Sequence, residues 1–235
     1  MPNKQIKSKD RVAEHGEVFT NEREVNAMLD LVKQETERIE SRFLEPACGN
    51  GNFLAEVLNR KLAICKQRYS SNQADYEKYS FLAVSSIYGV DIMEDNAQEC
   101  RDRLYSVWET AYKKICKTPY HEQIFDTIHF VLKKNILCGN ALTLKQYDDS
   151  PITFAQWDFT IGSLVKRKDY QLSELLDGQS KHKGDREQVG FDLFGDGDPV
   201  DDKSDWVYDE ETKGYIPGPI KEYPPVDYWR IQGVK

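Results

Sequence analysis

A short apolar run followed by two closely spaced glycines constrains the fold of this chain more than any other feature. Residues 43–54 read Phe-Leu-Glu-Pro-Ala-Cys-Gly-Asn-Gly-Asn-Phe-Leu, and a helical apolar pattern begins directly after Gly51. Glycine tolerates backbone conformations that are costly for other residues, and it lets a ligand approach the main chain closely. The pattern predicts a buried strand, a turn through Gly49 and Gly51, and a helix whose first amide groups face a bound nucleotide cofactor. A plain tight turn is the alternative interpretation.

The residues around the two glycines resemble a known signature. Residues 45–54 are similar to the loop that binds S-adenosyl-L-methionine (SAM) in adenine-specific DNA methyltransferases of restriction-modification systems, with the pattern Asp-Pro-x-Cys-Gly-Ser-Gly-x-Phe-Leu. The chain departs from this pattern at Glu45 and Asn50, which keep a carboxylate and a hydrogen-bonding side chain of similar reach. The resemblance implies an α/β fold with a doubly wound, Rossmann-like SAM-dependent methyltransferase domain, and SAM as its cofactor.

Three further segments, together with the fourth strand expected at residues 157–162, extend the resemblance to about residues 18–161. Residues 18–21 are similar to the Tyr-Thr-Pro segment that packs against the methionine end of SAM, although Phe19 can also be interpreted as a hydrophobic staple on the next helix. Residues 89–92 are similar to the second strand of the family, whose acid binds the ribose. Residues 139–142 are similar to the third-strand segment, whose acid accepts a hydrogen bond from the adenine of SAM, and the amide oxygen of Asn140 can accept the same bond.

Asp91 is the candidate ribose ligand, because a carboxylate at the end of the second strand can accept bonds from both hydroxyls. The usual interval from the glycine loop is about twenty residues, and an insertion at residues 70–87 accounts for the extra length here. A capping aspartate after an ordinary strand is the alternative. The residues that the resemblance assigns to SAM binding are Phe19, Thr20, Glu45, Pro46, Ala47, Cys48, Gly49, Asn50, Gly51, Asn52, Phe53, Asp91, Ile92, Asn140 and Ala141.

Apolar periodicity predicts three helices, at residues 25–32, 53–69 and 94–116. Asn21 and Glu24 form a plausible capping pair for the first of them. Residues 70–78 are polar and are expected to form a loop. Residues 135–142 are expected to form a third strand and turn.

The segment that carries the chemistry in this family is replaced. The fourth strand, expected at residues 157–162, leads in the family into Asn/Asp-Pro-Pro-Tyr/Phe, which holds the target amino group and stacks a ring on a flipped base. This chain has Ser163-Leu164-Val165-Lys166 instead. Ser163 still offers an oxygen, but the prolines and the ring are gone, so no catalytic residue is assigned. For Tyr170 a packing role, and for residues 223–225 (Tyr-Pro-Pro) an extended linker, are favoured over a catalytic role.

The formal net charge of −8 is concentrated in one place. Residues 192–211 contain nine acids and one lysine, and the rest of the chain has 31 acids and 31 bases. The stretch is interpreted as an acidic linker, and it does not fit a calcium loop. Residues 166–168 and 181–186 form the concentrated basic patch, for which DNA phosphate contact and a solvated loop are both open.

Cysteines and histidines indicate no metal site. The five cysteines are scattered and are expected to be reduced core or near-core thiols, and the four histidines are isolated. The sequence shows no apolar run long enough for a membrane span and no secretory signal, so a cytoplasmic protein without a membrane partner is expected.

The sequence divides into a flexible basic leader (residues 1–17), a SAM-binding methyltransferase-like domain (18–165) and an irregular acidic tail with prolines and glycines (166–235). The last strands of the family fold cannot be located in the tail, so truncation or completion by another chain is expected. The leading hypothesis is an enzyme that transfers a methyl group from SAM to the exocyclic amino group of adenine in DNA. The alternative is a catalytically inactive SAM-binding or scaffold subunit of a DNA modification complex, with a specificity or catalytic partner. A small-molecule or protein methyltransferase is a third possibility.

Overall fold

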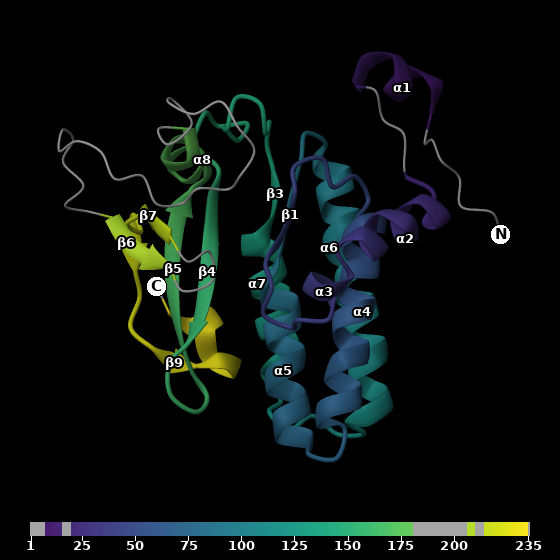
Figure 1. Ribbon diagram of the computed structural model, residues 1–235, viewed down its shortest axis with the longest axis vertical. Helices are drawn as coiled ribbons and strands as arrows, with labels where there is room; N and C mark the ends of the chain where they lie inside the picture. Colours follow the sequence, from purple (N-terminus) through teal and green to yellow (C-terminus); the bar gives the residue numbers. More distant parts are fainter. Residues whose placement is uncertain (1–7, 16–19, 181–205, 210–213, 235) are drawn as a thin grey trace.

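The computed structural model describes residues 8–15, 20–180, 206–209 and 214–234. Its centre is a parallel sheet of three strands, in the order β1 (Phe43–Glu45), β2 (Ile87–Asp91) and β3 (Ile136–Cys138) (Figure 1). All five residues of β2 are buried, as expected for a strand that is covered on both faces. The prediction of an α/β fold with a parallel sheet is therefore confirmed.

Two helices lie in each connection between neighbouring parallel strands, which need long crossovers. These helices are α4 (Asn52–Tyr69) and α5 (Gln73–Ser85) between β1 and β2, and α6 (Glu94–Ile115) and α7 (Ile124–Asn135) between β2 and β3. The predicted helices at residues 53–69 and 94–116 are confirmed as α4 and α6.

The expectation of a loop at residues 70–78 is wrong, because α5 begins at Gln73. Helix α5 gives no clear apolar pattern in the sequence, because two side chains on its buried face are polar. Glu77 and Ser80 are both fully buried. Glu77 accepts a hydrogen bond from the Tyr112 hydroxyl, and Ser80 Oγ accepts one from Trp108 Nε1 at 3.1 Å. Both partners lie on α6, so the burial of these polar groups depends on tertiary contacts.

The two faces of the parallel sheet pack against different layers. Ile87 of β2 belongs to the main core, together with residues of α4 to α7. Tyr88 and Val90 point to the other face and pack against a second cluster that includes Phe154 and Leu172. Leu44 of the edge strand β1 lies beside Tyr88 in register and is 45% exposed. The second layer therefore covers β2 and β3 better than it covers β1.

The N-terminal part contains α1 (Lys9–His15), α2 (Glu22–Leu31) and α3 (Lys33–Thr36). The capping pair predicted for α2 is confirmed, since Asn21 Oδ1 accepts from Arg23 N at 3.0 Å and the Asn21 N–H donates to Glu24. Within the expected flexible leader, residues 9–15 form α1, and residues 1–7 and 16–17 lie outside the described residues.

Residues 157–162, expected as a fourth strand of the parallel sheet, lie in a different sheet. Strand β4 (Thr153–Phe159) pairs antiparallel with β5 (Leu164–Gln171), through a turn in which Gly162 has a φ of 62°. Because the tight turn reverses the chain directly after Phe159, β4 forms a hairpin with β5 instead of joining β1. The Trp157 Nε1 atom donates to Asn135 Oδ1 at 3.0 Å, which fixes the hairpin against α7.

Much of residues 166–235, expected to be irregular, is regular in the structure. The proposed boundary at residue 165 falls inside β5, whose inward positions include Arg167 and Asp169. These two side chains form a buried bidentate ion pair, with N···O distances of 2.6 and 2.7 Å, so β5 lacks the apolar alternation of most strands. The later elements are α8 (Leu172–Ser180), β6 (Trp206–Asp209), β7 (Gly214–Pro217), β8 (Lys221–Glu222), β9 (Val226–Asp227) and the 3₁₀ helix η1 (Tyr228–Gly233).

One core connects the helices of the parallel sheet with the β4–β5 hairpin, because Trp157 and Val165 belong to the same buried cluster as residues of α4 to α7. All five cysteines are free thiols; four are buried and Cys138 is partly buried, which confirms the predicted core or near-core positions. Within the described parts of the chain, no helix has the length and hydropathy to cross a membrane.

Candidate functional site

The carboxyl ends of the three parallel strands bring the sequence-predicted residues to one edge of the sheet. The glycine turn follows β1, Asp91 and Ile92 lie at the end of β2, and Asn140 follows β3. The turn and β2 are in direct contact, because Cys48 N donates to Val90 O at 2.9 Å and Gly49 N donates to Asp91 Oδ2 at 2.8 Å. This edge is where open α/β sheets bind their ligands.

The turn has the backbone conformation that the sequence predicts. Gly49 and Gly51 have φ angles of 52° and 83°, a region that favours glycine. Gly51 is also the N-cap of the 18-residue helix α4 and provides no side-chain cap. The first amide groups of α4 therefore remain available to an acceptor on a ligand.

Gly51 is required for packing as well as for its conformation. A Cβ at this position would lie 2.7 Å from Cys100 Sγ and 3.2 Å from Cys100 Cα. A Cβ on Gly51 would therefore project toward α6. The sequence leads instead to the expectation that a missing Cβ in this turn allows a ligand to approach the main chain. Cys48 and Cys100 are hydrogen-bonded, and this bond together with burial raises the pKa of the Cys48 thiol.

Asp91 is buried and holds the turn and the start of α6 together. Its Oδ2 accepts from Gly49 N, and its Oδ1 accepts from Met93 N at 2.9 Å and from Asn96 Nδ2 at 3.2 Å. A carboxylate offers about four acceptor positions, so one position on Oδ2 is left for a ligand hydroxyl. Binding of both ribose hydroxyls would require a ligand to displace one of these protein donors.

Asn50 lies between the two glycines and has an acceptor without a partner. Its side chain is buried, and Asn50 Nδ2 donates to Glu99 Oε1 at 3.4 Å. Among the described residues, no donor lies within hydrogen-bond distance of the buried Asn50 Oδ1. A buried amide oxygen of this kind is usually satisfied, and because the atom is enclosed by protein a ligand would reach it only after a local rearrangement of the turn.

The remaining predicted residues of the turn differ in exposure. Pro46 and Ala47 are exposed, whereas Asn52 and Phe53 are half-buried at the start of α4. Glu45 accepts from Ala47 N at 3.3 Å, and burial raises the pKa of its carboxyl group.

Of the segment before α2, Thr20 is exposed and Phe19 lies outside the described residues. The predicted contact of this segment with SAM therefore stays a prediction.

The turn after β3 uses Asn140 differently from the prediction. Asn140 Oδ1 accepts from Leu142 N at 2.9 Å and from Thr143 N at 3.3 Å, so it stabilises its own turn. The neighbouring Ala141 is half-buried. Ile92 and Leu142 are 40% and 94% exposed. These two side chains add apolar surface to the edge, of the kind that a flat ring can cover.

Ser163 lies far from the glycine turn. Lys78 Nζ donates to Gly162 O at 2.6 Å, which places the β4–β5 turn beside the first half of α5. The adjacent Tyr79 stacks on Tyr69, the last residue of α4, with a centroid distance of 3.8 Å. An 18-residue helix is about 27 Å long, and Gly51 precedes its first residue. Ser163, whose Oγ donates to Asp227 at 2.6 Å, therefore cannot contact a ligand at the turn.

The other substitutes for the missing ring also have structural roles. Tyr170 is buried, as the packing interpretation predicts. Tyr223 is buried, donates to Asp169 Oδ2 at 3.2 Å and stacks under Arg167, whose Cζ lies 4.2 Å from the ring centroid.

The basic patch at residues 166–168 is neutralised by ion pairs. Lys166 pairs with Glu222, Arg167 with Asp169, and Lys168 with Asp158. Each of these three positive charges thus has a carboxylate partner in the described part of the chain, and DNA phosphate contact stays a prediction. Residues 181–186 lie outside the described part.

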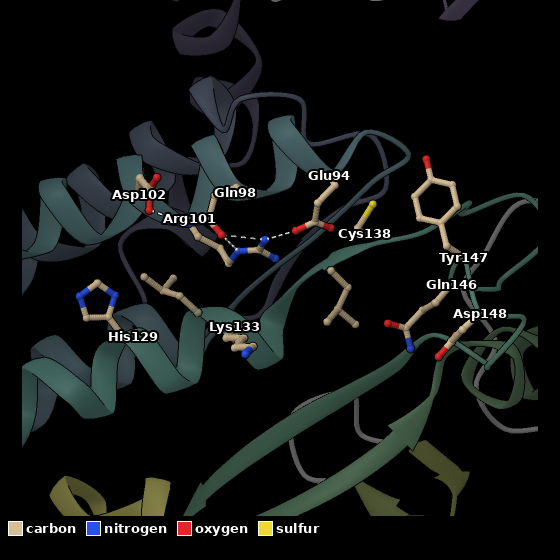
Figure 2. Close-up of a pocket in the computed structure, with 12 residues that line it drawn as sticks. Glu94, Gln98, Arg101, Asp102, His129, Lys133, Cys138, Gln146, Tyr147 and Asp148 are labelled. Carbon is tan, nitrogen blue, oxygen red and sulfur yellow. Dashed lines mark hydrogen bonds and ion pairs between the residues drawn. The ribbon is translucent and has the colours of Figure 1, made fainter.

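A hollow of about 640 Å³ borders the candidate edge between α6, α7 and β3 (Figure 2). Arg101 lies in it and bonds Glu94 at 2.6 Å and the Ile136 carbonyl at 2.9 Å. Tyr147 and Cys138 line the end nearest β2. Neither glycine of the turn lines the hollow, so the two features are neighbours and not one site.

Four residues of α6 were not predicted as site residues: Glu99, Cys100 and Arg103, which contact the turn, and Asn96, which bonds Asp91. Their spacing places them on one helical face, which was the available signal. Comparisons with protein-family models, curated proteins and solved structures gave no match.

Proposed function

We propose that this chain binds SAM at the turn between β1 and α4. One observation carries the proposal: an uncapped helix N-terminus opens at a turn with two positive φ angles, beside the buried Asp91 at the carboxyl end of the next parallel strand. This arrangement suits a ligand with polar groups for the helix amides and a hydroxyl for the carboxylate. The resemblance of residues 45–54 to the methyltransferase loop selects SAM among such ligands.

The residues present fit a cofactor of this kind. The amides of Asn52 and Phe53 offer polar contacts, and Oδ2 of Asp91 offers an acceptor for a hydroxyl. Ile92 and Leu142 provide apolar surface for a ring. When bound, SAM supplies an activated methyl group.

We further propose that the chain is the cofactor-binding subunit of a complex that methylates adenine in DNA, with the acceptor site on another chain. The position of Ser163 supports this role, because a methyl transfer needs donor and acceptor aligned at contact distance. The segment that would hold the adenine in the resembled family lies at the opposite end of α4 from the turn. This is the scaffold alternative, with a cofactor site on a Rossmann-like domain.

Methylation of adenine in DNA by this chain alone is the second candidate. The match of the turn to the DNA-specific signature favours it, since residues 46–49 and 51 keep the pattern. Incubation with radiolabelled SAM and duplex DNA tests it directly. Label in DNA with the purified chain alone would replace the subunit proposal.

Isothermal titration calorimetry with SAM tests the cofactor proposal, using Asp91→Asn and Asp102→Asn as matched isosteric variants. Asp102 is an exposed residue of α6 that bonds Gln98. We expect wild type and Asp102→Asn to bind SAM equally, and Asp91→Asn to bind at least tenfold more weakly, because one charge-assisted contact is worth about 1.5–3 kcal/mol. Absence of binding to the wild type, or equal binding by both variants, would contradict the proposal.

A further inference from the structure

The glycine turn is held by one face of α6. Along this face Asn96 donates to Asp91 Oδ1, Cys100 packs under Gly51, and Arg103 Nε donates to Asn50 O at 2.8 Å. These residues are three or four positions apart and therefore line one side of the helix.

The peptide unit between Asn50 and Gly51 is fixed at both of its polar groups. Arg103 holds its carbonyl oxygen, and the Gly51 N–H donates to Cys48 O at 2.9 Å. Glycine φ angles are permissive on both sides of Asn50, so a free peptide unit could rotate and redirect the start of α4. The contact with Arg103 restricts this rotation from outside the turn.

Glu99 orients the arginine and the Asn50 side chain together. Glu99 Oε1 lies 3.7 Å from Arg103 Nη2, one turn away on α6, and 3.4 Å from Asn50 Nδ2. The arginine side chain is 34% exposed, so its hydrogen bond is only partly screened by solvent.

We propose that Arg103, oriented by Glu99, is a positioning residue that keeps the turn in the conformation required for the cofactor. The proposal rests on the proposed SAM binding. Arg103 acts through the Asn50 carbonyl, to which its Nε donates. Ligand affinity should therefore depend on Arg103 more than overall stability does, because pre-organisation lowers the ordering cost of binding.

The first test measures SAM affinity by calorimetry for wild type, Arg103→Met, Arg103→Lys and the control Arg101→Met. Arg101 lies on the same helix but bonds Glu94, Gln98 and the Ile136 carbonyl. We expect Arg103→Met to raise the Kd about tenfold, the value of a charge-assisted hydrogen bond, and Arg103→Lys to recover part of the loss by donating to Asn50 O. Thermal unfolding of the two methionine variants should be similar. Equal affinity of both would overturn the proposal.

The second test does not need the cofactor. Hydrogen exchange of the Gly51 amide should be faster in Arg103→Met than in wild type or Arg101→Met, because the peptide unit loses one of its two anchors. Unchanged exchange would overturn the positioning role whether or not SAM binds. A third outcome is that the wild type binds no SAM while the Gly51 amide still exchanges faster in Arg103→Met than in wild type. That result would support the positioning of the turn and count against the proposed cofactor.

Discussion

Replacement of Gly51 by alanine separates two reasons for a glycine at this turn. Gly51 has a φ of 83°, and an added Cβ would lie 2.7 Å from Cys100 Sγ. Gly162 also has a positive φ, 62°, but an added Cβ there meets nothing within 4 Å. At Gly233 neither restriction applies. The three glycines therefore form a series: Gly51 is restricted by both its φ angle and its packing, Gly162 by its φ angle alone, and Gly233 by neither.

The expected losses of stability follow from this series. A left-handed conformation costs a non-glycine residue about 1–2 kcal/mol. Forcing a methyl group into a packed contact costs about 1–3 kcal/mol, and the clash at Gly51 involves the Cα of Cys100 as well as its flexible sulfur. We expect Gly51→Ala to lose about 3 kcal/mol, Gly162→Ala about 1 kcal/mol, and Gly233→Ala less than about 0.5 kcal/mol.

Urea unfolding followed by circular dichroism measures these differences, and thermal unfolding gives an independent check. For a chain of this size, each kcal/mol shifts Tm by about 2–4 °C. If Gly51→Ala and Gly162→Ala lose the same free energy within about 0.5 kcal/mol, the packing of Gly51 against α6 contributes nothing and the argument is refuted.

Three further predictions concern buried groups away from the turn. Lys61 is fully buried and donates to three oxygens. Lys61→Met should lower the free energy of unfolding in urea by about 2 kcal/mol, because these acceptors lose their donor. The exposed Lys66→Met should lower it by less than about 0.5 kcal/mol. The Tyr228 hydroxyl donates to the buried carboxylate of Glu77 at 3.0 Å, so Tyr228→Phe should lower the free energy of unfolding by about 1.5 kcal/mol. The exposed Tyr120→Phe should lower it by nothing measurable. Equal losses in the two variants would contradict a stabilising role of this hydrogen bond. Burial raises the pKa of the Cys65 thiol to about 12 from its usual 9.0, so the unfolded chain ionises first and stability is lost as pH rises from 9 towards 12, by about 1.4 kcal/mol per pH unit. The free energy of unfolding, measured at several alkaline pH values, should fall less steeply with pH in Cys65→Ala than in wild type, by about 1.4 kcal/mol per pH unit. Identical slopes in the two proteins would contradict the prediction.

Local signals predicted the elements that depend on local physics. The Asn21–Glu24 capping box, the helices α4 and α6 and the strand–turn–helix unit around Gly51 all match the sequence patterns. Gly49 and Asp91 were both assigned to one cofactor site, and the structure places them in contact, 42 positions apart, because parallel strands end at one edge.

Elements whose burial depends on tertiary partners could not be predicted. Helix α5 buries Glu77, which accepts a hydrogen bond from Tyr112 of α6, and strand β5 buries Arg167 and Asp169, which pair with each other. A single sequence shows these residues as polar, so it indicated a loop and an irregular tail.

The candidate site was predicted in part. The residues of the turn and Asp91 could be placed because glycine and strand-end acids carry their own signals. The contacts from Glu99 and Arg103 could not, because helical spacing places these residues on one face with Asn96 and Cys100 but does not show which segment that face contacts. The pairing of β4 with β5 was also not predicted, because the antiparallel partner of a strand depends on contacts that the sequence around Ser163 does not show.

The most direct test of the account is a SAM titration followed by ¹H–¹⁵N NMR of the amide groups. The account predicts that the largest shifts occur at Gly49, Gly51, Asn52 and Phe53, the amides of the turn and of the first turn of α4. No shift on addition of SAM, or shifts confined to the hollow around Lys133 and Gln146, would contradict the claim that the glycine turn is the cofactor site.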